Sequence, residues 1–273
     1  MSPIGVFDSG YGGLTILRQM RQLLPQYDYL YLGDNARAPY GSHSFEVIYQ
    51  YTLQAVQHLF NENCQLVILA CNTASAKALR TIQQNDLERI DPKRRVLGVI
   101  RPTVEAIGSL TKSRHVGLLA TAGTVNSGSY RMEIRKLHPD IQLTSLACPM
   151  WVPLVENFEF DSPGADYFVK NRIDCILRLD PEIDCLILGC THYPLLMNKI
   201  LKYTPPGVRL VPQGDYVASS LQDYLQRHPE MEQRLSRNGQ CRYLTTESSD
   251  KFSESGMLFM HERIEAENIV LAR

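Results

Sequence analysis

Residues 66–75 read LVILACNTAS, an uninterrupted apolar run that ends at a cysteine and passes into small polar residues. Residues that favour helix formation follow this stretch. A continuous apolar run rich in β-branched residues is typical of a strand buried in a parallel sheet. In open α/β sheets, ligands bind beyond the carboxyl ends of such strands. The stretch therefore predicts a parallel α/β fold with Cys71 at a strand tip, close to a ligand.

The same design recurs at residues 185–194, which read CLILGCTHYP. Aligned without gaps, residues 65–71 (QLVILAC) and 184–190 (DCLILGC) make Cys190 the equivalent of Cys71. A single cysteine at a strand end is often only a small buried hydrophobe. Two cysteines in matching positions, each at the start of a predicted helix, indicate chemistry instead. A helix N-terminus lowers the pKa of a thiol from about 8.5 towards neutrality.

The composition indicates a cytoplasmic globular protein. The chain has 273 residues, 44% of them hydrophobic, which suits one large or two medium α/β domains. A net charge of −1 gives no electrostatic footprint for nucleic acid or an anionic membrane. Because long apolar runs and a signal-like start are missing from the sequence, we expect neither a membrane span nor a signal peptide. The seven cysteines are scattered without CxxC spacing, which favours a reducing compartment over disulfides or a zinc site.

Apolar runs of strand length alternate with helical patterns along nearly the whole chain. This alternation predicts parallel sheets with helices on both faces, as in Rossmann-like or flavodoxin-like domains. The predicted strands are residues 4–7, 29–32, 66–70, 96–100, 116–120, 142–147, 186–189, 208–211 and 242–245. The predicted helices are residues 14–24, 44–61, 75–85, 104–110, 127–137, 165–179, 195–203, 216–227 and 250–261.

The domain boundaries follow from the repeat, since no low-complexity linker marks them. One boundary falls near residues 97–101, and the other near 205–208, where Pro-Pro-Gly interrupts the pattern. The first predicted domain comprises residues 1–98 and 208–273, and the second comprises residues 99–207. Cys71 and Cys190 would then face each other across an interdomain cleft, a preferred location for ligand sites.

Polar residues also follow the first and fifth predicted strands. Residues 7–13 read FDSGYGG, a glycine-rich turn without the GxGxxG spacing of a dinucleotide site. The amides of such a turn can hold a substrate carboxylate, and Asp8 can accept a hydrogen bond from a ligand ammonium. Thr121 and Thr124 suit either carboxylate binding or helix capping. Loop 33–42 has the composition of a surface loop.

His192 lies two residues after Cys190, where its imidazole can stabilise a thiolate or relay a proton. A Cys-x-His metal site would need a second cluster of ligands, so we expect no metal. A Cys/His hydrolase would explain Cys190 and His192 but would leave Cys71 without a role.

Two thiols on opposite faces of one stereocentre can remove a proton from one side and return one from the other. One must be a thiolate while its partner is a thiol, and the two states exchange in each turnover. This is the requirement for a two-base racemase that needs no cofactor. The polar groups expected to set the two thiol pKa values are Asp8, Asn72, Thr73, Thr191 and His192.

Taken together, these motifs resemble those of the glutamate racemases, within the cofactor-independent aspartate/glutamate racemase superfamily. The resemblance spans about residues 4–214. It rests on FDSG at 7–10, GD at 33–34, PYG at 39–41, ACNTAS at 70–75 and GCTHYP at 189–194, and Thr121, Thr124 and residues 148–156 also fit it. Arg101 and the Met150-Trp151 pair depart from the usual pattern, away from the catalytic positions; Trp151 is expected to pack rather than react.

The resemblance implies two pseudosymmetric α/β domains with the active site between them, no cofactor, and often a homodimer. It implies that Cys71 acts on D-glutamate and Cys190 on L-glutamate, assisted by Asp8 and His192 respectively. Glu156 would support His192. The substrate's carboxylates and ammonium would be bound by Ser9, Pro39, Tyr40, Gly41, Asn72, Thr73, Thr121, Thr124 and Thr191. The product, D-glutamate, would serve bacterial peptidoglycan.

Three other interpretations stay open on sequence grounds. A racemase for aspartate or another amino acid belongs to the same superfamily. His192 favours glutamate as the substrate, since aspartate racemases typically have a glutamate side chain in place of this histidine. A non-catalytic amino-acid-binding regulatory protein would bind ligand without exchanging its α-proton. A pyridoxal enzyme would need a Schiff-base lysine such as Lys77, and the two thiols would then lack a purpose.

Overall fold

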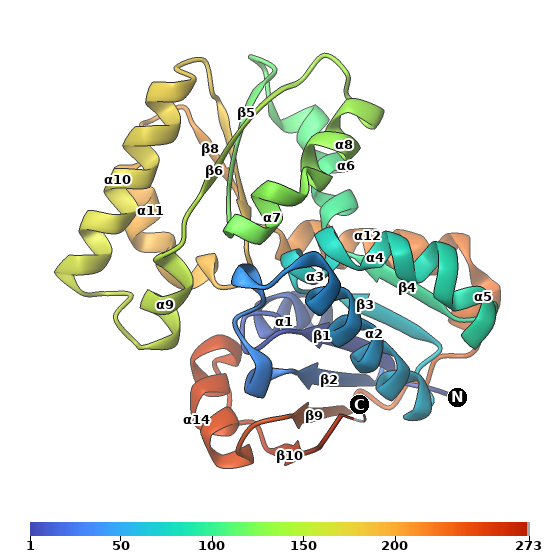
Figure 1. Cartoon of the computed structure of the whole chain (residues 1–273). Coiled ribbons are helices and arrows are strands. Elements are labelled where there is room, and N and C mark those ends of the chain that lie inside the picture. The colour runs from blue at the N-terminus through green and yellow to red at the C-terminus, as the bar shows by residue number, and fades with distance from the viewer. Residues whose placement is uncertain (272–273) are drawn as a thin grey trace. The chain divides into compact units, whose positions relative to one another are not determined.

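The computed structural model describes residues 1–271, which contain two all-parallel sheets (Figure 1). The chain divides into two compact units: unit 1 comprises Met1–Val99 and Gly214–Arg273, and unit 2 comprises Ile100–Gln213. The six-stranded sheet of unit 1 has the order β10-β9-β2-β1-β3-β4, and the four-stranded sheet of unit 2 has the order β6-β5-β7-β8. The two sheets share one winding, because β5, β6, β7 and β8 repeat the order of β1, β2, β3 and β4.

Unit 1 begins and ends the chain. Its elements are β1 (Ile4–Asp8), α1 (Leu14–Leu23), β2 (Tyr29–Gly33), the 3₁₀ turns η1 (Asn35–Arg37) and η2 (Tyr40–Ser42), α2 (Phe45–Asn61), β3 (Leu66–Leu69), α3 (Asn72–Lys77), α4 (Leu79–Thr81), the π-helical turn η3 (Ile82–Asp86), α5 (Leu87–Ile90), β4 (Arg95–Gly98), α12 (Gly214–Arg227), α13 (Pro229–Glu232), β9 (Cys241–Thr245), α14 (Ser249–Met260) and β10 (Ala266–Asn268).

The apolar runs of β1, β2 and β3 form the centre of unit 1, where every residue of these strands is buried. β1 pairs in parallel with both β2 and β3, so the carboxyl ends of the three strands lie at one edge of the sheet. α2 begins at its cap Ser44, whose side chain accepts the Val47 amide. The buried side chains of α2 share one apolar core with those of β1, β2 and β3, and α2 also contacts α3, so this burial stabilises the edge from which the Cys71 turn emerges.

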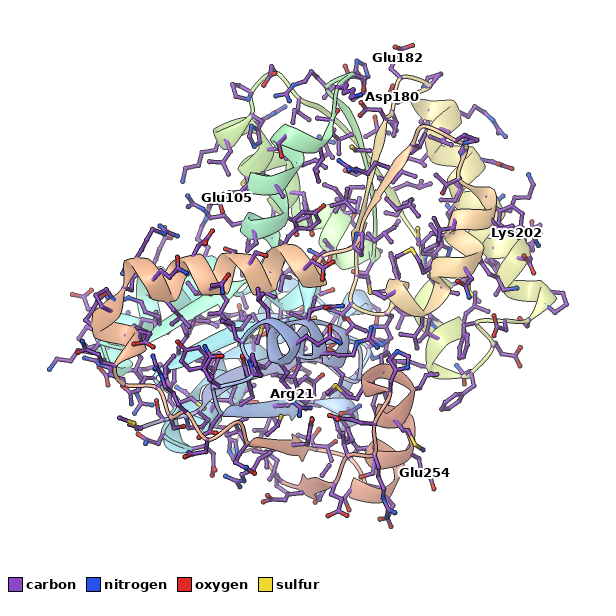
Figure 2. All side chains as sticks on the ribbon, turned by 180° about the vertical axis from the view of Figure 1, so that it is seen from behind. Arg21, Glu105, Asp180, Glu182, Lys202 and Glu254 are labelled. Atoms are coloured by element: carbon purple, nitrogen blue, oxygen red, sulfur yellow. The ribbon has the colours of Figure 1, made fainter. Side chains whose placement is uncertain are left out.

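The C-terminal segment returns to unit 1 and is attached to α1. α12 and α14 both pack against α1. The Arg18 guanidinium donates to the Phe259 carbonyl at 3.1 Å, and Arg21 pairs with Glu262 just after α14. Figure 2 labels Arg21 on α1 and Glu254 on α14. β9 then adds to β2, so the segment that returns at Gly214 extends the sheet that carries Cys71.

Unit 2 is one continuous segment. Its elements are α6 (Ile100–Leu110), β5 (His115–Ala120), α7 (Ala122–Ser127), α8 (Ser129–Leu137), β6 (Gln142–Ala147), α9 (Trp151–Glu156), α10 (Pro163–Leu179), β7 (Cys185–Gly189), the 3₁₀ turn η4 (Tyr193–Leu196), α11 (Met197–Tyr203) and β8 (Arg209–Val211). β7 lies between β5 and β8, as β3 lies between β1 and β4.

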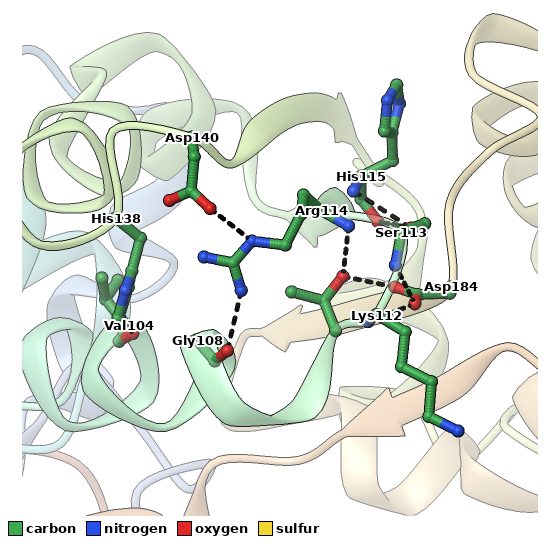
Figure 3. Close-up of polar contacts among 10 residues, drawn as sticks. Val104, Gly108, Lys112, Ser113, Arg114, His115, His138, Asp140 and Asp184 are labelled. Atoms are coloured by element: carbon green, nitrogen blue, oxygen red, sulfur yellow. Dashed lines mark hydrogen bonds and ion pairs between the residues drawn. The ribbon is translucent and has the colours of Figure 1, made fainter.

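A polar network closes the amino-terminal edge of the unit 2 sheet (Figure 3). Asp184, just before β7, accepts hydrogen bonds from the Thr111 hydroxyl at 2.6 Å and from the amides of Lys112 and Ser113 at 2.6 and 2.8 Å. In the same turn, the Arg114 guanidinium pairs with Asp140 at 2.6 Å. These contacts lie at the end of β7 opposite Cys190, so they hold the strand in place and leave its carboxyl end clear.

All nine predicted strands are present, with ends that differ from the prediction by at most two residues. One prediction is wrong: the sequence pattern assigns residues 208–211 to the first domain, but β8 pairs with β7 in the sheet of unit 2. The reason is that Pro205-Pro206-Gly207 only turns the chain between α11 and β8. Residues 272–273 of the predicted first domain lie outside the described residues. Within residues 1–271, no helix is both long and apolar enough to cross a membrane.

Candidate functional site

In unit 1, Cys71 lies two residues after the end of β3 and is the N-cap of α3. Its buried sulfur accepts a hydrogen bond from the Ala74 amide, with Sγ and N 3.5 Å apart. The Ser9 hydroxyl lies 3.5 Å from the same sulfur. An amide and a hydroxyl therefore converge on the thiol, and both can stabilise its anionic form.

Asp8 ends β1 and shapes the turn that carries Ser9. The carboxylate is fully buried and accepts the Gly10 amide at 3.0 Å. The main-chain carbonyl of Asp8 accepts the Asp34 amide at 3.0 Å, which ties the tips of β1 and β2 together. Gly13 allows the turn to close, because a Cβ there would lie 2.4 Å from the Asp8 Cβ. Asp8, Ser9 and Cys71 are thus brought together at one edge of the sheet.

Asn72 and Thr73 are the first two residues of α3, and both side chains are buried beside the Cys71 turn. The loop of Pro39, Tyr40 and Gly41 leads into and forms η2, which packs against α3. Lys77, the last residue of α3, donates to the His43 carbonyl at 2.8 Å and so connects the loop to the Cys71 helix.

Asp34 is an organising residue that the sequence interpretation left out of the site. Its carboxylate is fully buried and accepts hydrogen bonds from the Tyr40 hydroxyl, from the Arg37 guanidinium at 2.7 Å and from the Thr246 hydroxyl at 2.9 Å. Tyr40 therefore directs its hydroxyl to Asp34, while Pro39 is exposed. The signal was available, since Asp34 belongs to the quoted GD motif, but its partner Thr246 lies 212 residues away in the chain.

In unit 2, Cys190 lies directly after β7, and His192 is the second residue after it. The Cys190 sulfur lies 3.8 Å from His192 Nδ1, and His192 Nε2 lies 3.1 Å from Glu156 Oε1 at the end of α9. Burial opposes a charged imidazole, but the hydrogen bonds and negative charges of Cys190 and Glu156 raise the pKa of His192 to about 10. The three side chains form a relay in which His192 is protonated at neutral pH.

Thr121 and Thr124 perform the capping role that the sequence left open. Thr121 is the N-cap of α7: its side chain accepts the Thr124 amide at 3.3 Å and donates to the Thr124 hydroxyl at 3.1 Å. The pair follows β5, the strand beside β7, so it lies at the same edge of the sheet as Cys190. Thr191, between Cys190 and His192, is buried.

Trp151 packs against neighbouring side chains, and its indole N–H donates to the main chain instead of to the reactive groups. Its ring is fully buried, meets the Tyr193 ring edge-on at 4.7 Å, and donates to the Phe168 carbonyl at 3.3 Å. Arg101 is exposed and pairs at 2.8 Å with Glu105, which Figure 2 labels. Among residues 1–271, no cluster of three or more histidine, cysteine or acidic side chains is arranged to hold a metal ion.

The comparisons with known proteins agree with one another. The family described as Asp/Glu/Hydantoin racemase matches residues 4–221. The curated glutamate racemase of Ruegeria sp. (strain TM1040) is 40% identical over 271 residues, which cover 96% of this chain and 97% of that protein. The crystal structure of glutamate racemase isoform RacE1 from Bacillus anthracis has a TM-score of 0.90 at 32% identity, covering 99% of this chain and 98% of that one. The glutamate racemase of Francisella tularensis subsp. tularensis SCHU S4, solved in complex with D-glutamate, has a TM-score of 0.87 at 32% identity, with coverage of 99% and 98%.

Proposed function

The chain belongs to the Asp/Glu racemase family, and from that premise we propose that Cys71 and Cys190 are the two acid/base groups with which it works. The activity is that of a glutamate racemase, the interconversion of L- and D-glutamate. The observation that carries the proposal is the repeat: each of two equivalent strands, β3 and β7, is followed within two residues by a cysteine that has polar partners.

In the proposed reaction one thiolate removes the α-proton of glutamate, and the electron pair is held by the adjacent carboxylate as a planar carbanion. The other thiol then donates its proton to the opposite face. The first cysteine ends as a thiol and the second as a thiolate, so the enzyme is ready for the reverse direction. By family resemblance, Cys71 acts on D-glutamate and Cys190 on L-glutamate.

We assign the assisting roles to the groups nearest each thiol. The protonated His192, held by Glu156, favours the thiolate form of Cys190 and can return a proton to it. Ser9 contacts the Cys71 sulfur, and Asp8 shapes the turn that carries Ser9. Both residues therefore control whether Cys71 is a thiol or a thiolate. The carboxylates and ammonium of the substrate bind to side chains and to one loop. These are Ser9, Asn72, Thr73, Thr121, Thr124, Thr191 and the loop of Pro39, Tyr40 and Gly41.

The test replaces each cysteine with serine, which keeps the size but removes the acidic thiol. We expect Cys71→Ser and Cys190→Ser to lower racemisation of D-glutamate in deuterium oxide by at least about 10³-fold, as the loss of a required acid/base group predicts. Circular dichroism and deuterium at the α-carbon provide the readout. Cys175→Ser, on α10, is the matched control and should keep full activity.

Near-normal turnover by either Cys71→Ser or Cys190→Ser would reject the two-base assignment. Equal turnover of aspartate by the unaltered protein would reject glutamate as the preferred substrate. Binding of glutamate without any α-proton exchange would instead indicate a regulatory protein.

We further propose that the active form is a cytoplasmic homodimer that supplies D-glutamate for peptidoglycan, as the family resemblance implies. All seven cysteines are free thiols, which suits a reducing compartment. Light scattering after gel filtration distinguishes a monomer of 31.0 kDa from a dimer of twice that mass. A monomer with full activity would reject the dimer.

A further inference from the structure

Tyr31, the third residue of β2, lies beneath the turn that carries Ser9. The side chain is fully buried, and its hydroxyl donates to the Gly10 carbonyl at 2.9 Å. Gly10 directly follows Ser9, whose own hydroxyl lies 3.5 Å from the Cys71 sulfur. A hydrogen bond from β2 therefore anchors the carbonyl of Gly10, the residue that follows Ser9 in the turn.

The turn that carries Ser9 packs closely against β2. A Cβ at Gly13 would lie 3.0 Å from the Tyr31 hydroxyl, and a Cβ at Gly33 would lie 2.8 Å from the Gly10 carbonyl. Both glycines thus permit a close approach that larger residues would prevent. The Gly10 carbonyl is closely packed against β2, so its hydrogen bond with the Tyr31 hydroxyl fixes its direction.

The hydroxyl is a constant donor. Burial raises the pKa of Tyr31 well above 10, and the neighbouring negative charges of Asp8 and Cys71 raise it further, against a hydrogen bond from the Leu14 amide. The Tyr31 phenol therefore stays protonated over the pH range in which the enzyme works, and it continues to donate to the Gly10 carbonyl.

The ring is held by the returning C-terminal segment. Phe252 of α14 lies 6.0 Å from the Tyr31 ring and Tyr243 of β9 lies 6.4 Å from it, both in tilted contacts. Phe252 also contacts Tyr11 at 5.3 Å. The orientation of the hydroxyl is thus fixed by packing as well as by its hydrogen bond.

We propose that Tyr31 is a positioning residue for proton exchange at Cys71: its hydroxyl fixes the Gly10 carbonyl, and this fixes Ser9 against the thiol. The inference rests on the role proposed above for Cys71. It adds a residue that does not itself touch the substrate but determines how well one of the two thiols is solvated by its neighbour.

Tyr29 provides a matched control on the same strand. It is also buried, and its hydroxyl also donates to backbone carbonyls, those of Leu24 at 3.0 Å and Met20 at 3.3 Å. Two residues apart, Tyr29 and Tyr31 lie on one face of β2, but Tyr29 lies at the end away from Cys71. Replacing either tyrosine with phenylalanine removes one buried hydroxyl and keeps the ring.

We expect Tyr31→Phe to lower kcat about tenfold, equivalent to about 1.4 kcal/mol, while Tyr29→Phe changes kcat less than about twofold. The second readout needs no turnover: alkylation by iodoacetamide across pH, with each cysteine identified by mass spectrometry. The labelling midpoint of Cys71 should move to higher pH in Tyr31→Phe, because the thiolate loses its positioned hydroxyl. The midpoint of Cys190 should not move.

Two further variants sharpen the result. Ser9→Ala should reproduce the Cys71 shift, and adding Tyr31→Phe to it should change little more, as expected for two residues that act through one contact. If Tyr31→Phe does not fold, Phe252→Leu loosens the ring instead and should shift Cys71 in the same direction. Equal kcat and equal Cys71 labelling in Tyr31→Phe and Tyr29→Phe would overturn the proposal. Failure of the two-base assignment itself would appear separately, as turnover by Cys71→Ser.

Discussion

At the scale of single residues, the protonation of His192 controls what Cys190 can do. A buried imidazole and a buried thiol would both prefer to be neutral. The hydrogen bond with Cys190 alters that balance, and so does Glu156, whose carboxylate accepts from His192 Nε2 at 3.1 Å; both favour the imidazolium. With the pKa of His192 raised to about 10, a positive charge persists beside the Cys190 sulfur throughout the neutral range.

Glu156→Gln tests this relay. Glutamine keeps the hydrogen-bonding shape but removes the negative charge, so the pKa of His192 should fall and the alkaline limb of the kcat profile should move to lower pH. On that limb we expect a loss of about tenfold, as for one charge-assisted hydrogen bond. Glu159→Gln, exposed three residues later, is the control. An unchanged alkaline limb in Glu156→Gln would mean that Glu156 does not set the charge of His192.

The same pair makes stability depend on pH with a definite sign. The folded pKa of His192, about 10, lies above its ordinary value of 6.5. The stabilisation is therefore complete below about pH 6.5 and is lost as the pH rises towards 10. Between pH 6.5 and 10, the free energy of unfolding measured in urea should fall less in Glu156→Gln than in the unaltered protein.

The residues that carry motifs were predictable, and those that support them were not. Cys71, Cys190 and His192 stand in short local patterns that sequence alone exposes. Asp34 and Tyr31 act through contacts with Thr246 and Phe252, from a segment more than 200 positions away in the chain. No periodicity links such partners, because tertiary packing alone brings them together.

At the scale of elements, apolar runs predicted the strands well because buried parallel strands are apolar on both faces. β10 was missed because its three residues, Ala266–Asn268, form a short polar edge strand without such a run. α9 was missed because Trp151–Glu156 is a single short helix with a proline inside it. The predicted helix 75–85 is in fact divided among α3, α4 and η3, and begins earlier, at Asn72 beside Cys71.

Asp184→Ala tests how β7 is held at the end opposite Cys190. Burial alone would raise the pKa of Asp184, but hydrogen bonds from Thr111 and from the amides of Ser113 and Lys112 lower it. Removing the acceptor should cost about 1–3 kcal/mol of unfolding free energy at neutral pH, measured in urea, with kcat unchanged. Because the folded pKa is lowered, the difference should shrink as the pH falls below about 4.

Glu182→Ala is the control for that experiment, since Glu182 is exposed two residues earlier and is labelled with Asp180 in Figure 2. It should cost less than about 0.5 kcal/mol. A similar loss in both variants would show that the Asp184 network does not stabilise β7.

At the scale of the whole molecule, the chain passes between its units twice, after Val99 and after Gln213. The first passage was predictable, because a strand ends and a helix begins there. The second was expected too early, at Pro205-Pro206-Gly207, since a proline–glycine turn within a unit and a passage between units have the same composition. What distinguishes them is the pairing of β8 with β7, which is a property of the sheet.

Gln213 marks the second passage and is bound firmly to unit 2. Its buried amide nitrogen donates to the Thr103 hydroxyl of α6 at 2.9 Å and to the Tyr130 hydroxyl of α8 at 2.8 Å. Burial raises the pKa of Tyr130 far above its usual range, although hydrogen bonds with Gln213 and Thr103 oppose this, so Tyr130 stays a neutral hydroxyl. One side chain thus joins the end of unit 2 to two of its helices.

Gln213→Ala should therefore weaken unit 2 as a whole and not only its last residue. Losing two buried hydrogen bonds should cost about 1–3 kcal/mol, and hydrogen exchange should increase in both α6 and α8. Gln226→Ala, on the exposed face of α12, is the control and should leave both helices protected. If exchange in Gln213→Ala rises only around residue 213, the amide is a local contact, and α6 and α8 are held by their apolar faces alone.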